Sequence, residues 1–517
     1  MNRILDLILA FMAATLFVGI MAVPSMAATV VEGPTPIFEG AATADNDLTM
    51  YNDKIALSFA VGTNNYWNMT RGSVLDIGIN DGQNNFKQDL TNDSEFLLDL
   101  WTSTGSYKGE NLLTDVDAKY SVDGDTAKVV MKTRYWVADA DKNGKDDEKE
   151  YGTVQKPLNV TTTYTLKDGD SFVTMVTTVE NPADNKVTYK NMYSGYSIST
   201  NAASMYGPFG FYPEVKTTGI AVGANEKVQE RFGEFVATYS DSYTASVQMD
   251  DADSYKGSSG YKDVYKLRNI APGHTEKYTG ELLVSDKSET ASIISRYIAR
   301  ENIKDASKLS GTVTDDSGKP VAGAYVIVEK TGVYMPTEKS QSVNGQAVGT
   351  PVANMMPFVW TRTDENGKYS FDLPNTGWND GTENVLGNGD YTYKLKVEAS
   401  GYTSLLTDEI KLTGDKTEDL KIEQGAHIHL KATDQKGNAI PFKIQISGIT
   451  AEMKTLGGAV QFSDAFASSN DLDFNLSKAE NVTITATYST PFLSKSASWK
   501  GDITSAGLDH TFVIDIP

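Results

Sequence analysis

The stretch VTTTYTLKDGDSFVTMV at residues 160–176 decides the fold. It consists of two runs rich in β-branched and aromatic residues, which favour extended strands, on either side of an Asp-Gly turn. An Asp-Gly turn between two such runs is typical of an antiparallel hairpin. Similar short runs recur between turns from about Leu48 to Val284. The sequence therefore predicts an all-β chain that opens with a large antiparallel β-sandwich over residues 28–284.

The N-terminus has the features of an export signal. A positive start precedes an apolar run at residues 4–23 that only Asp6 interrupts, and Ser25 and Ala27 supply the small residues that signal peptidase needs. We expect a signal peptide at 1–27, with a retained membrane anchor as the alternative. The chain has no cysteine, so it cannot carry a lipoprotein anchor. The expected location is extracellular, periplasmic or on the cell surface, with no stable membrane span after cleavage.

Charge and histidine content limit the functions. The chain has 46 basic and 68 acidic residues, a net charge of −22 that repels nucleic acid and anionic lipid. It has four histidines, and none in its first 273 residues. Because general acid–base and metal-hydrolytic sites depend heavily on histidine, the count argues against such catalysis in the first sandwich. We expect a protein without a catalytic site, although carboxylate-only or tyrosine-based catalysis stays open.

One amphipathic helix is predicted from Ser285 to Ile303, within a connector at 285–308. Ser285 or Ser288 is a candidate N-cap. Its apolar face consists of Ala291, Ile294, Tyr297 and Ile298. Its place between two different strand patterns indicates an interdomain connector or brace, with a partner-binding helix as the alternative.

Residues 310–328 read as a strand, an Asp-rich turn and a second strand, and further strand and turn motifs follow at 361–371 and 389–402. In this order the motifs resemble the carboxypeptidase regulatory-like domain, which implies a prealbumin-type sandwich at about 309–423. A polar insertion at about 332–358 departs from that family and predicts a surface loop.

The opening of that unit recurs at residues 427–446, which again read as a strand, an Asp-x-x-Gly turn, a proline and a strand. Internal repetition of this kind predicts a second small prealbumin- or immunoglobulin-like sandwich at 424–517.

The sharpest local motif is DADKNGKDDEKE at residues 139–150, which matches the twelve-residue calcium loop D-x-[DN]-x-[DN]-G-x5-E. A hard cation takes six to eight oxygen ligands, which alternate residues around a glycine can provide. The predicted ligands are Asp139, Asp141, Asn143, the carbonyl of Lys145, Asp147 and Glu150. Asp146 replaces an aliphatic residue, and the expected flanks are strands, so the motif resembles the calcium loops of extracellular bacterial and thrombospondin-type repeats. The alternative is an acidic hairpin tip that keeps a sheet edge soluble.

The histidines give weaker signals. His427 and His429 stand two apart on a predicted strand, so both imidazoles point to one face. That spacing can begin a metal site, but the nearest preceding carboxylate is Glu423, and an ordinary strand face is the alternative. We expect structural roles for His274 and His510.

An aromatic stretch predicts a ligand-binding loop. Its Gly and Pro content indicates a loop, and exposed aromatic rings there could stack on sugars. The candidate ligand-binding residues are Tyr206, Phe209, Phe211 and Tyr212. The alternative is that such residues serve as core and cross-strand pairs.

TYTL at 163–166 and TTVEN at 177–181 resemble the galactose-mutarotase-like supersandwich. That resemblance implies fold and sugar affinity; active mutarotases need histidines that this domain lacks.

The whole chain resembles the non-catalytic N-terminal region of exported PHP-type metallohydrolases. We therefore expect an exported, non-catalytic binding or scaffold protein with carbohydrate or cell-envelope affinity and a structural calcium ion. The alternatives are the accessory region of such a metallohydrolase and a cell-surface adhesion protein.

Overall fold

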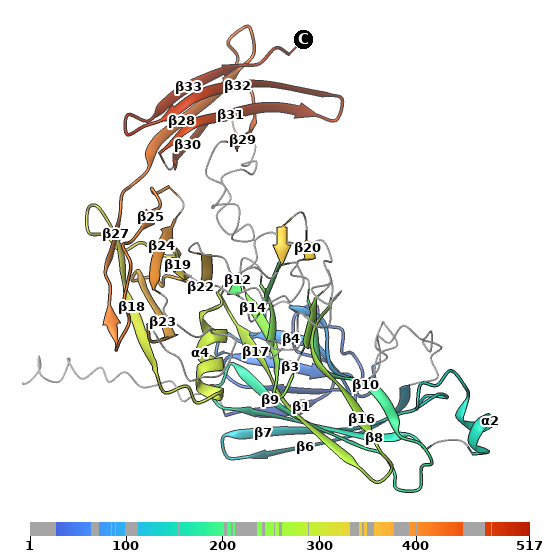
Figure 1. Ribbon diagram of the computed structural model, residues 1–517. Coiled ribbons are helices and arrows are strands. Elements are labelled where there is room, and N and C mark those ends of the chain that lie inside the picture. Colours follow the sequence, from blue (N-terminus) through green and yellow to red (C-terminus); the bar gives the residue numbers. More distant parts are fainter. Residues whose placement is uncertain are drawn as a thin grey trace, which may run out of the picture.

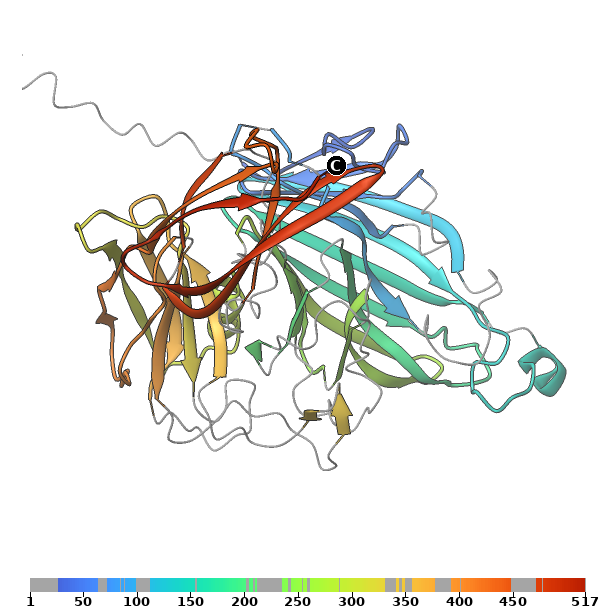
Figure 2. The same cartoon turned by 90° about the horizontal axis from the view of Figure 1, so that it is seen from above.

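The computed structural model shows an all-β chain, which confirms the predicted fold class of one large antiparallel sandwich, two smaller sandwiches and a connecting helix (Figure 1). It describes residues 27–516 except 64–71, 84, 88, 99–111, 154–155, 201–203, 208–209, 212–234, 240–242, 253, 258–260, 288, 331–340, 344–345, 349–355, 377–391, 400, 448–470 and 477. All but the last residue of the predicted signal peptide lies outside the described residues. Figure 2 shows the two large sheets from above, with the second sandwich beside them and the third, in red, overlapping both in this view. The domain boundaries at 284, 308 and 423 stay predictions.

The large sandwich contains two antiparallel sheets. The eight-stranded sheet has the order β1 (Thr29–Glu32), β2 (Leu48–Tyr51), β3 (Ile55–Phe59), β4 (Val74–Ile79), β5 (Thr91–Leu98), β10 (Tyr189–Thr200), β16 (Tyr261–Ile270), β15 (Ser254–Gly257). The nine-stranded sheet has the order β12 (Gly210–Phe211), β11 (Ser204–Gly207), β13 (Phe235–Tyr239), β14 (Thr244–Met249), β17 (Thr275–Ser285), β9 (Phe172–Glu180), β8 (Leu158–Lys167), β7 (Thr126–Tyr135), β6 (Leu112–Asp123).

The predicted hairpin forms as β8 and β9, and Gly169 takes the left-handed φ of 72° that its turn requires. Burial alternates along both strands, so one face of each packs against the other sheet. The ring of Tyr164 on β8 lies 4.8 Å from that of Phe59 on β3, and Tyr196 of β10 makes a 3.0 Å hydroxyl–hydroxyl hydrogen bond with Thr177 of β9. Apolar burial therefore joins the sheets.

The connecting helix, α4 (Ala291–Arg300), is shorter than predicted and begins after Thr290. Ser285 does not cap it, because that residue ends β17, where it pairs with Thr244. The predicted apolar face is buried, together with Ile293.

Contacts from α4 and the turn before it hold the first two sandwiches together. Arg296 makes a bidentate ion pair with buried Glu281 of β17, and its guanidinium lies 3.8 Å from the ring centre of Phe172 on β9. On the other side, Thr290 Oγ1 accepts a 3.0 Å hydrogen bond from the backbone N–H of Trp360 in the second sandwich. These contacts fit the brace that the sequence predicted.

The two small sandwiches share the strand order of their first sheets. The second has one sheet of β23 (Lys368–Pro374), β18 (Ala306–Asp315) and β26 (Lys416–Thr417) with β27 (Leu420–Ile422), and another of β22 (Met356–Arg362), β19 (Tyr325–Lys330), β24 (Tyr393–Glu398) and β25 (Leu405–Leu406). The third has β30 (Asp471–Leu476), β28 (Ala426–Thr433) and β33 (Leu508–Val513) in one sheet and β29 (Lys443–Ser447), β31 (Ala479–Thr490) and β32 (Leu493–Ile503) in the other. In both, the first strand pairs in parallel with the last.

Their opening turns are equivalent as well. The side-chain oxygen of Asp315 accepts hydrogen bonds from the N–H groups two and four residues later, and Asp434 does the same. Gly318 and Gly437 follow with φ of 85° and 83°. The repeated sequence motif thus builds a repeated turn.

The insertion at 332–358 is described only in part. Its described residues form a hairpin of β20 (Gln341–Val343) and β21 (Gln346–Val348), and its end belongs to β22. The expectation of a loop is therefore wrong for these residues, because backbone pairing takes up their N–H and C=O groups.

Candidate metal loop and ligand-binding residues

The predicted calcium loop lies between β7 and β8 and is closed by its own hydrogen bonds. The carboxylate of Asp139 accepts from the backbone N–H of Asn143 at 3.1 Å and of Gly144 at 2.9 Å. Gly144 has φ of 85° and Lys142 of 53°, so two left-handed residues turn the chain back on itself.

The last residues of the loop are helical, and the strands β7 and β8 flank the loop as expected. Residues Asp147–Tyr151 form a short helix, α2, with Asp146 as N-cap and Gly152 in the left-handed C-cap conformation. Asp146 accepts from the N–H of Lys149 at 3.2 Å, and acidic residues fill the first turn, where the helix dipole favours negative charge. The loop thus ends in a short helix, and β8 follows from Leu158.

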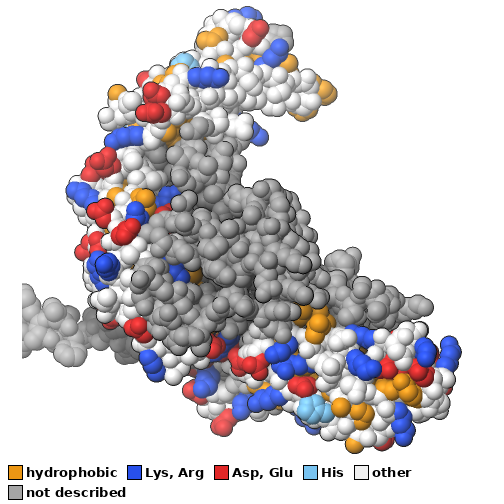
Figure 3. Space-filling view, viewed as in Figure 1, with side chains coloured by type: hydrophobic (Ala, Val, Ile, Leu, Met, Phe, Trp, Pro, Cys, Tyr) orange, Lys and Arg blue, Asp and Glu red, His pale blue; other side chains and the backbone are white. Residues whose placement is uncertain are grey.

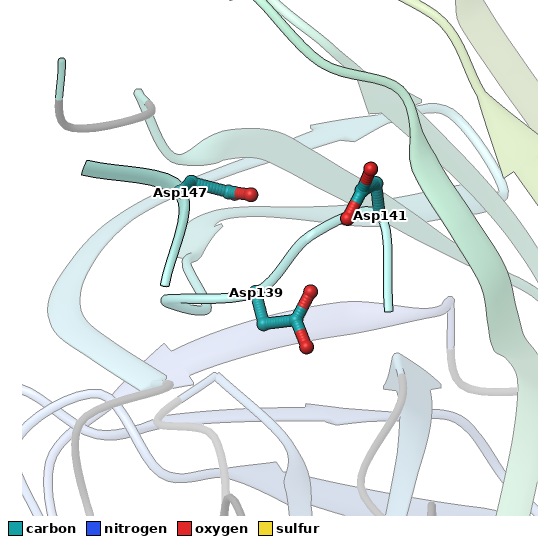
Figure 4. A group of neighbouring side chains, drawn as sticks. All are labelled: Asp139, Asp141 and Asp147. Atoms are coloured by element: carbon teal, nitrogen blue, oxygen red, sulfur yellow. The ribbon is translucent and has the colours of Figure 1, made fainter. Parts of the chain in front are cut away.

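Three carboxylates of the loop converge. One side-chain oxygen each of Asp139, Asp141 and Asp147 lies within 4.8 Å of the others, the one such group among the described residues (Figure 4). Asp147 is 2% exposed. Its Oδ2 accepts a 3.0 Å hydrogen bond from the N–H of Ala140, whereas its buried Oδ1 has no hydrogen-bond partner. A buried carboxylate oxygen without a partner is costly, so this arrangement calls for a cation or a proton.

The pKa values of the two most buried carboxylates are shifted in opposite directions. Burial raises the pKa of Asp147, and the negative charges of Asp141 and Asp139 add to this, against the opposing hydrogen bond from Ala140. For Asp141, burial also favours a higher pKa, but hydrogen bonding from Tyr151 and the charge of Lys190 outweigh it and lower the pKa.

The remaining predicted ligands bond to one another. The amide of Asn143 donates to Glu150 at 2.6 Å, and Lys145 Nζ lies 3.2 Å from the other oxygen of Glu150. Glu150, the predicted closing ligand, is therefore not part of the three-carboxylate group. Asn143 Oδ1 accepts the N–H of Lys145 at 2.9 Å.

Two residues that the motif does not contain also contact the group. The hydroxyl of Tyr151 donates to Asp141 at 3.2 Å, and Lys190 Nζ lies 3.6 Å from the same carboxylate. Lys190 belongs to β10, and its backbone N–H donates to the carbonyl of Ala140 at 2.9 Å. No sequence signal links this lysine to the loop, because β10 reaches it only through the fold.

The predicted aromatic loop is partly a hairpin. Tyr206 in β11 stands opposite Phe211 in β12, and Gly207 stands opposite Gly210. The expectation of a loop is wrong for these four residues, because they pair through their backbones. Phe209 and Tyr212 lie outside the described residues.

Charged side chains of both signs are interspersed over the described surface seen in Figure 3. In the described part of the chain, no helix has the length and apolar character that a membrane crossing requires.

No protein-family model and no curated protein matches the sequence. Solved structures match parts of the fold. An α-mannosidase from Enterococcus faecalis is similar with a TM-score of 0.34 and 13% identity over 53% of this chain and 32% of its own. A protein from Synechocystis has a TM-score of 0.28 and 8% identity over 46% and 93%, and a shaft pilin from Lactobacillus rhamnosus has 0.21 and 15% over 41% and 98%. The chain thus spans about a third of the mannosidase, and these likenesses are ones of fold alone.

Proposed function

We propose that this chain is an exported, non-catalytic β-sandwich protein that binds or scaffolds outside the cytoplasm and holds a structural calcium ion in the 139–150 loop. The observation that carries the calcium site is the buried Oδ1 of Asp147, which has no hydrogen-bond partner and belongs to a group of three carboxylates. All available donors are oxygens, the ligands that calcium prefers.

In this proposal Asp139, Asp141 and Asp147 hold the ion, and Asn143 Oδ1 and the carbonyl of Lys145 complete the loop contribution. Glu150 joins if its contacts with Asn143 and Lys145 open. The bound ion supplies positive charge that offsets the repulsion among the carboxylates. Because the loop also contacts β10, the ion would fasten the β7–β8 connection to the other sheet, in a chain that has no disulfide.

Thermal unfolding in calcium and in chelator tests the site. An ion that binds only the native state raises the free energy of unfolding by RT ln(1 + [Ca²⁺]/Kd), about 2.7 kcal/mol at a hundredfold excess over Kd. Equal melting temperatures in the two conditions would contradict the proposal.

The scaffold role is supported by the braced connection between the first two sandwiches. Arg296 bonds to the first sandwich and Thr290 to the second, so relative motion of the two sandwiches would break either the Arg296–Glu281 ion pair or the Thr290–Trp360 hydrogen bond. The resemblance of 309–423 to the carboxypeptidase regulatory-like domain accords with a binding module that is attached to other domains.

For the ligand we propose a carbohydrate or another cell-envelope polymer. The support is the aromatic hairpin, where Tyr206 stands opposite Phe211. Pull-down of the mature chain with insoluble cell-envelope polysaccharides, compared with the double variant Tyr206→Ala/Phe211→Ala, tests this. Equal retention of both proteins would show that the hairpin is not the binding site. No retention on any glycan would contradict the proposal that the ligand is a carbohydrate. Cell fractionation with N-terminal sequencing tests export and cleavage before Ala28.

A further inference from the structure

The outer face of the third sandwich brings two histidines and three aspartates together from three strands. His427 and His429 lie on β28, and their side chains alternate with buried Ile428 and Leu430. On one side β30 presents Asp471 and Asp473, and on the other β33 presents Asp509. All five side chains are at least partly exposed.

Each histidine already pairs with a carboxylate. Nε2 of His427 lies 2.7 Å from Asp473, and Nε2 of His429 lies 2.9 Å from Asp471. On a tetrahedral zinc ion, a nitrogen and an oxygen ligand stand roughly 3.3 Å apart, given metal–ligand distances of about 2.0–2.2 Å. A metal ion can therefore replace the shared proton of such a pair with side-chain shifts of about half an ångström.

Asp473 is the carboxylate that both histidines could share. It is hydrogen-bonded to His427, and the strand register places it directly opposite His429. Directly opposed residues of an antiparallel pair have Cβ atoms about 4.5–5.5 Å apart. For two imidazoles and one carboxylate to converge on one position, the His429 ring has to turn from Asp471 toward Asp473.

The second nitrogen of His429 has its own acidic neighbour. Nδ1 lies 3.4 Å from the carboxylate of Asp509. Histidine ligands of metals usually donate their other ring N–H to a carboxylate, which fixes the tautomer and the ring orientation. Lys431 shares this exposed face and stands opposite Asp471 in the strand register.

We propose that this face binds one divalent transition-metal ion such as zinc, through His427, His429 and Asp473, with Asp509 as the positioning residue for His429. The site lies on the solvent side of the sheet, so water or a donor from a partner fills the remaining coordination positions. It is separate from the 139–150 loop in position and in chemistry, because imidazole donors favour zinc over calcium.

Zinc titration of the mature chain by calorimetry tests the site, in excess calcium so that the 139–150 loop does not compete. We expect one zinc ion per chain. His427→Ala and His429→Ala should each weaken binding at least tenfold, and Asp509→Asn about tenfold. The matched control is His274→Ala, because His274 pairs with Glu276 at 2.9 Å in the same way but has no second histidine beside it.

Unchanged zinc affinity in both His427→Ala and His429→Ala would overturn the proposal, as would an equal loss in His274→Ala. A measurement on the wild type covers the case in which a variant does not fold. Zinc should shift the ring proton signals of two of the four histidines in the NMR spectrum. A shift of none, or of His510, whose ring packs against the ring of buried Phe512, would count against the site.

Discussion

Replacing Asp147 by Asn tests the metal loop most sharply, because the change should have opposite effects with and without calcium. Without the ion, the wild-type protein keeps a buried carboxylate oxygen that lacks a hydrogen-bond partner and faces two other acidic groups. Asparagine keeps an oxygen for the N–H of Ala140 and adds an N–H donor toward the carboxylates of Asp139 and Asp141.

The expected magnitudes follow from this geometry. Removing the unsatisfied buried group should raise the free energy of unfolding in chelator by about 1–3 kcal/mol. For a domain of 150–250 residues, each kcal/mol shifts the melting temperature by about 2–4 °C. In calcium at a hundredfold excess over Kd, the wild type gains about 2.7 kcal/mol. The variant, with one ligand neutralised, should gain much less.

The assay is scanning calorimetry of both proteins in calcium and in chelator. Asp184→Asn is the control, because Asp184 is an exposed aspartate paired with Lys156 outside the loop, and its calcium response should equal that of the wild type. Two results would refute the reasoning. One is a variant that is less stable than the wild type in chelator, and the other is a variant that keeps the full calcium shift.

Three further predictions follow from the described contacts. Because the pKa of Asp147 is raised, its protonated form stabilises the calcium-free protein below the ordinary aspartate pKa, and this stability is lost as the pH rises through the raised value. Protons then compete with calcium at low pH, so the increase in melting temperature caused by calcium should shrink on acidification. A pH series of melting temperatures in calcium and in chelator checks this. Arg296→Ala should lower the free energy of unfolding by about 3 kcal/mol, because it leaves the buried Glu281 carboxylate unpaired. The control Lys416→Ala, which breaks a more exposed ion pair, should lower it by less than about 1 kcal/mol. Urea unfolding measures both, and equal losses would contradict the prediction. Gly367→Ala should destabilise the protein far more than Gly318→Ala. Both glycines have positive φ, which costs an alanine about 1–2 kcal/mol, but only at Gly367 would the new Cβ lie 2.5 Å from a backbone oxygen. Similar melting temperatures of the two variants would contradict this.

The strand pattern of this chain was readable from local sequence, since β-branched runs and Asp-Gly turns act over a few residues. The turns at Asp315 and Asp434 were predictable for the same reason, because their hydrogen bonds span four residues. The start of α4 was not, since Ser285 looks like a cap locally but pairs with Thr244 forty-one residues earlier in the chain. Tertiary pairing overrides the local preference there.

The residues of the candidate sites also differ in whether the sequence could predict them. Asp139, Asp141 and Asp147 lie within nine residues and share a motif, so their convergence could be expected. Lys190 could not, and neither could the carboxylates beside His429, which lie 42 residues away on β30 and further still on β33. The spacing of residues in the sequence predicts which side chains share a face of one strand. Contacts between neighbouring strands can be predicted only when the strand order of the sheet is known.

The parallel pairing of first and last strands in the small sandwiches has a mechanical consequence. In each, the chain enters along β18 or β28 and leaves along β27 or β33 in the same direction, so the two attachment points lie at opposite ends. A pull between those points runs along the strands and loads their hydrogen bonds together in shear, rather than opening them one by one. Modules connected in this way can pass tension from one sandwich to the next without their strands unzipping.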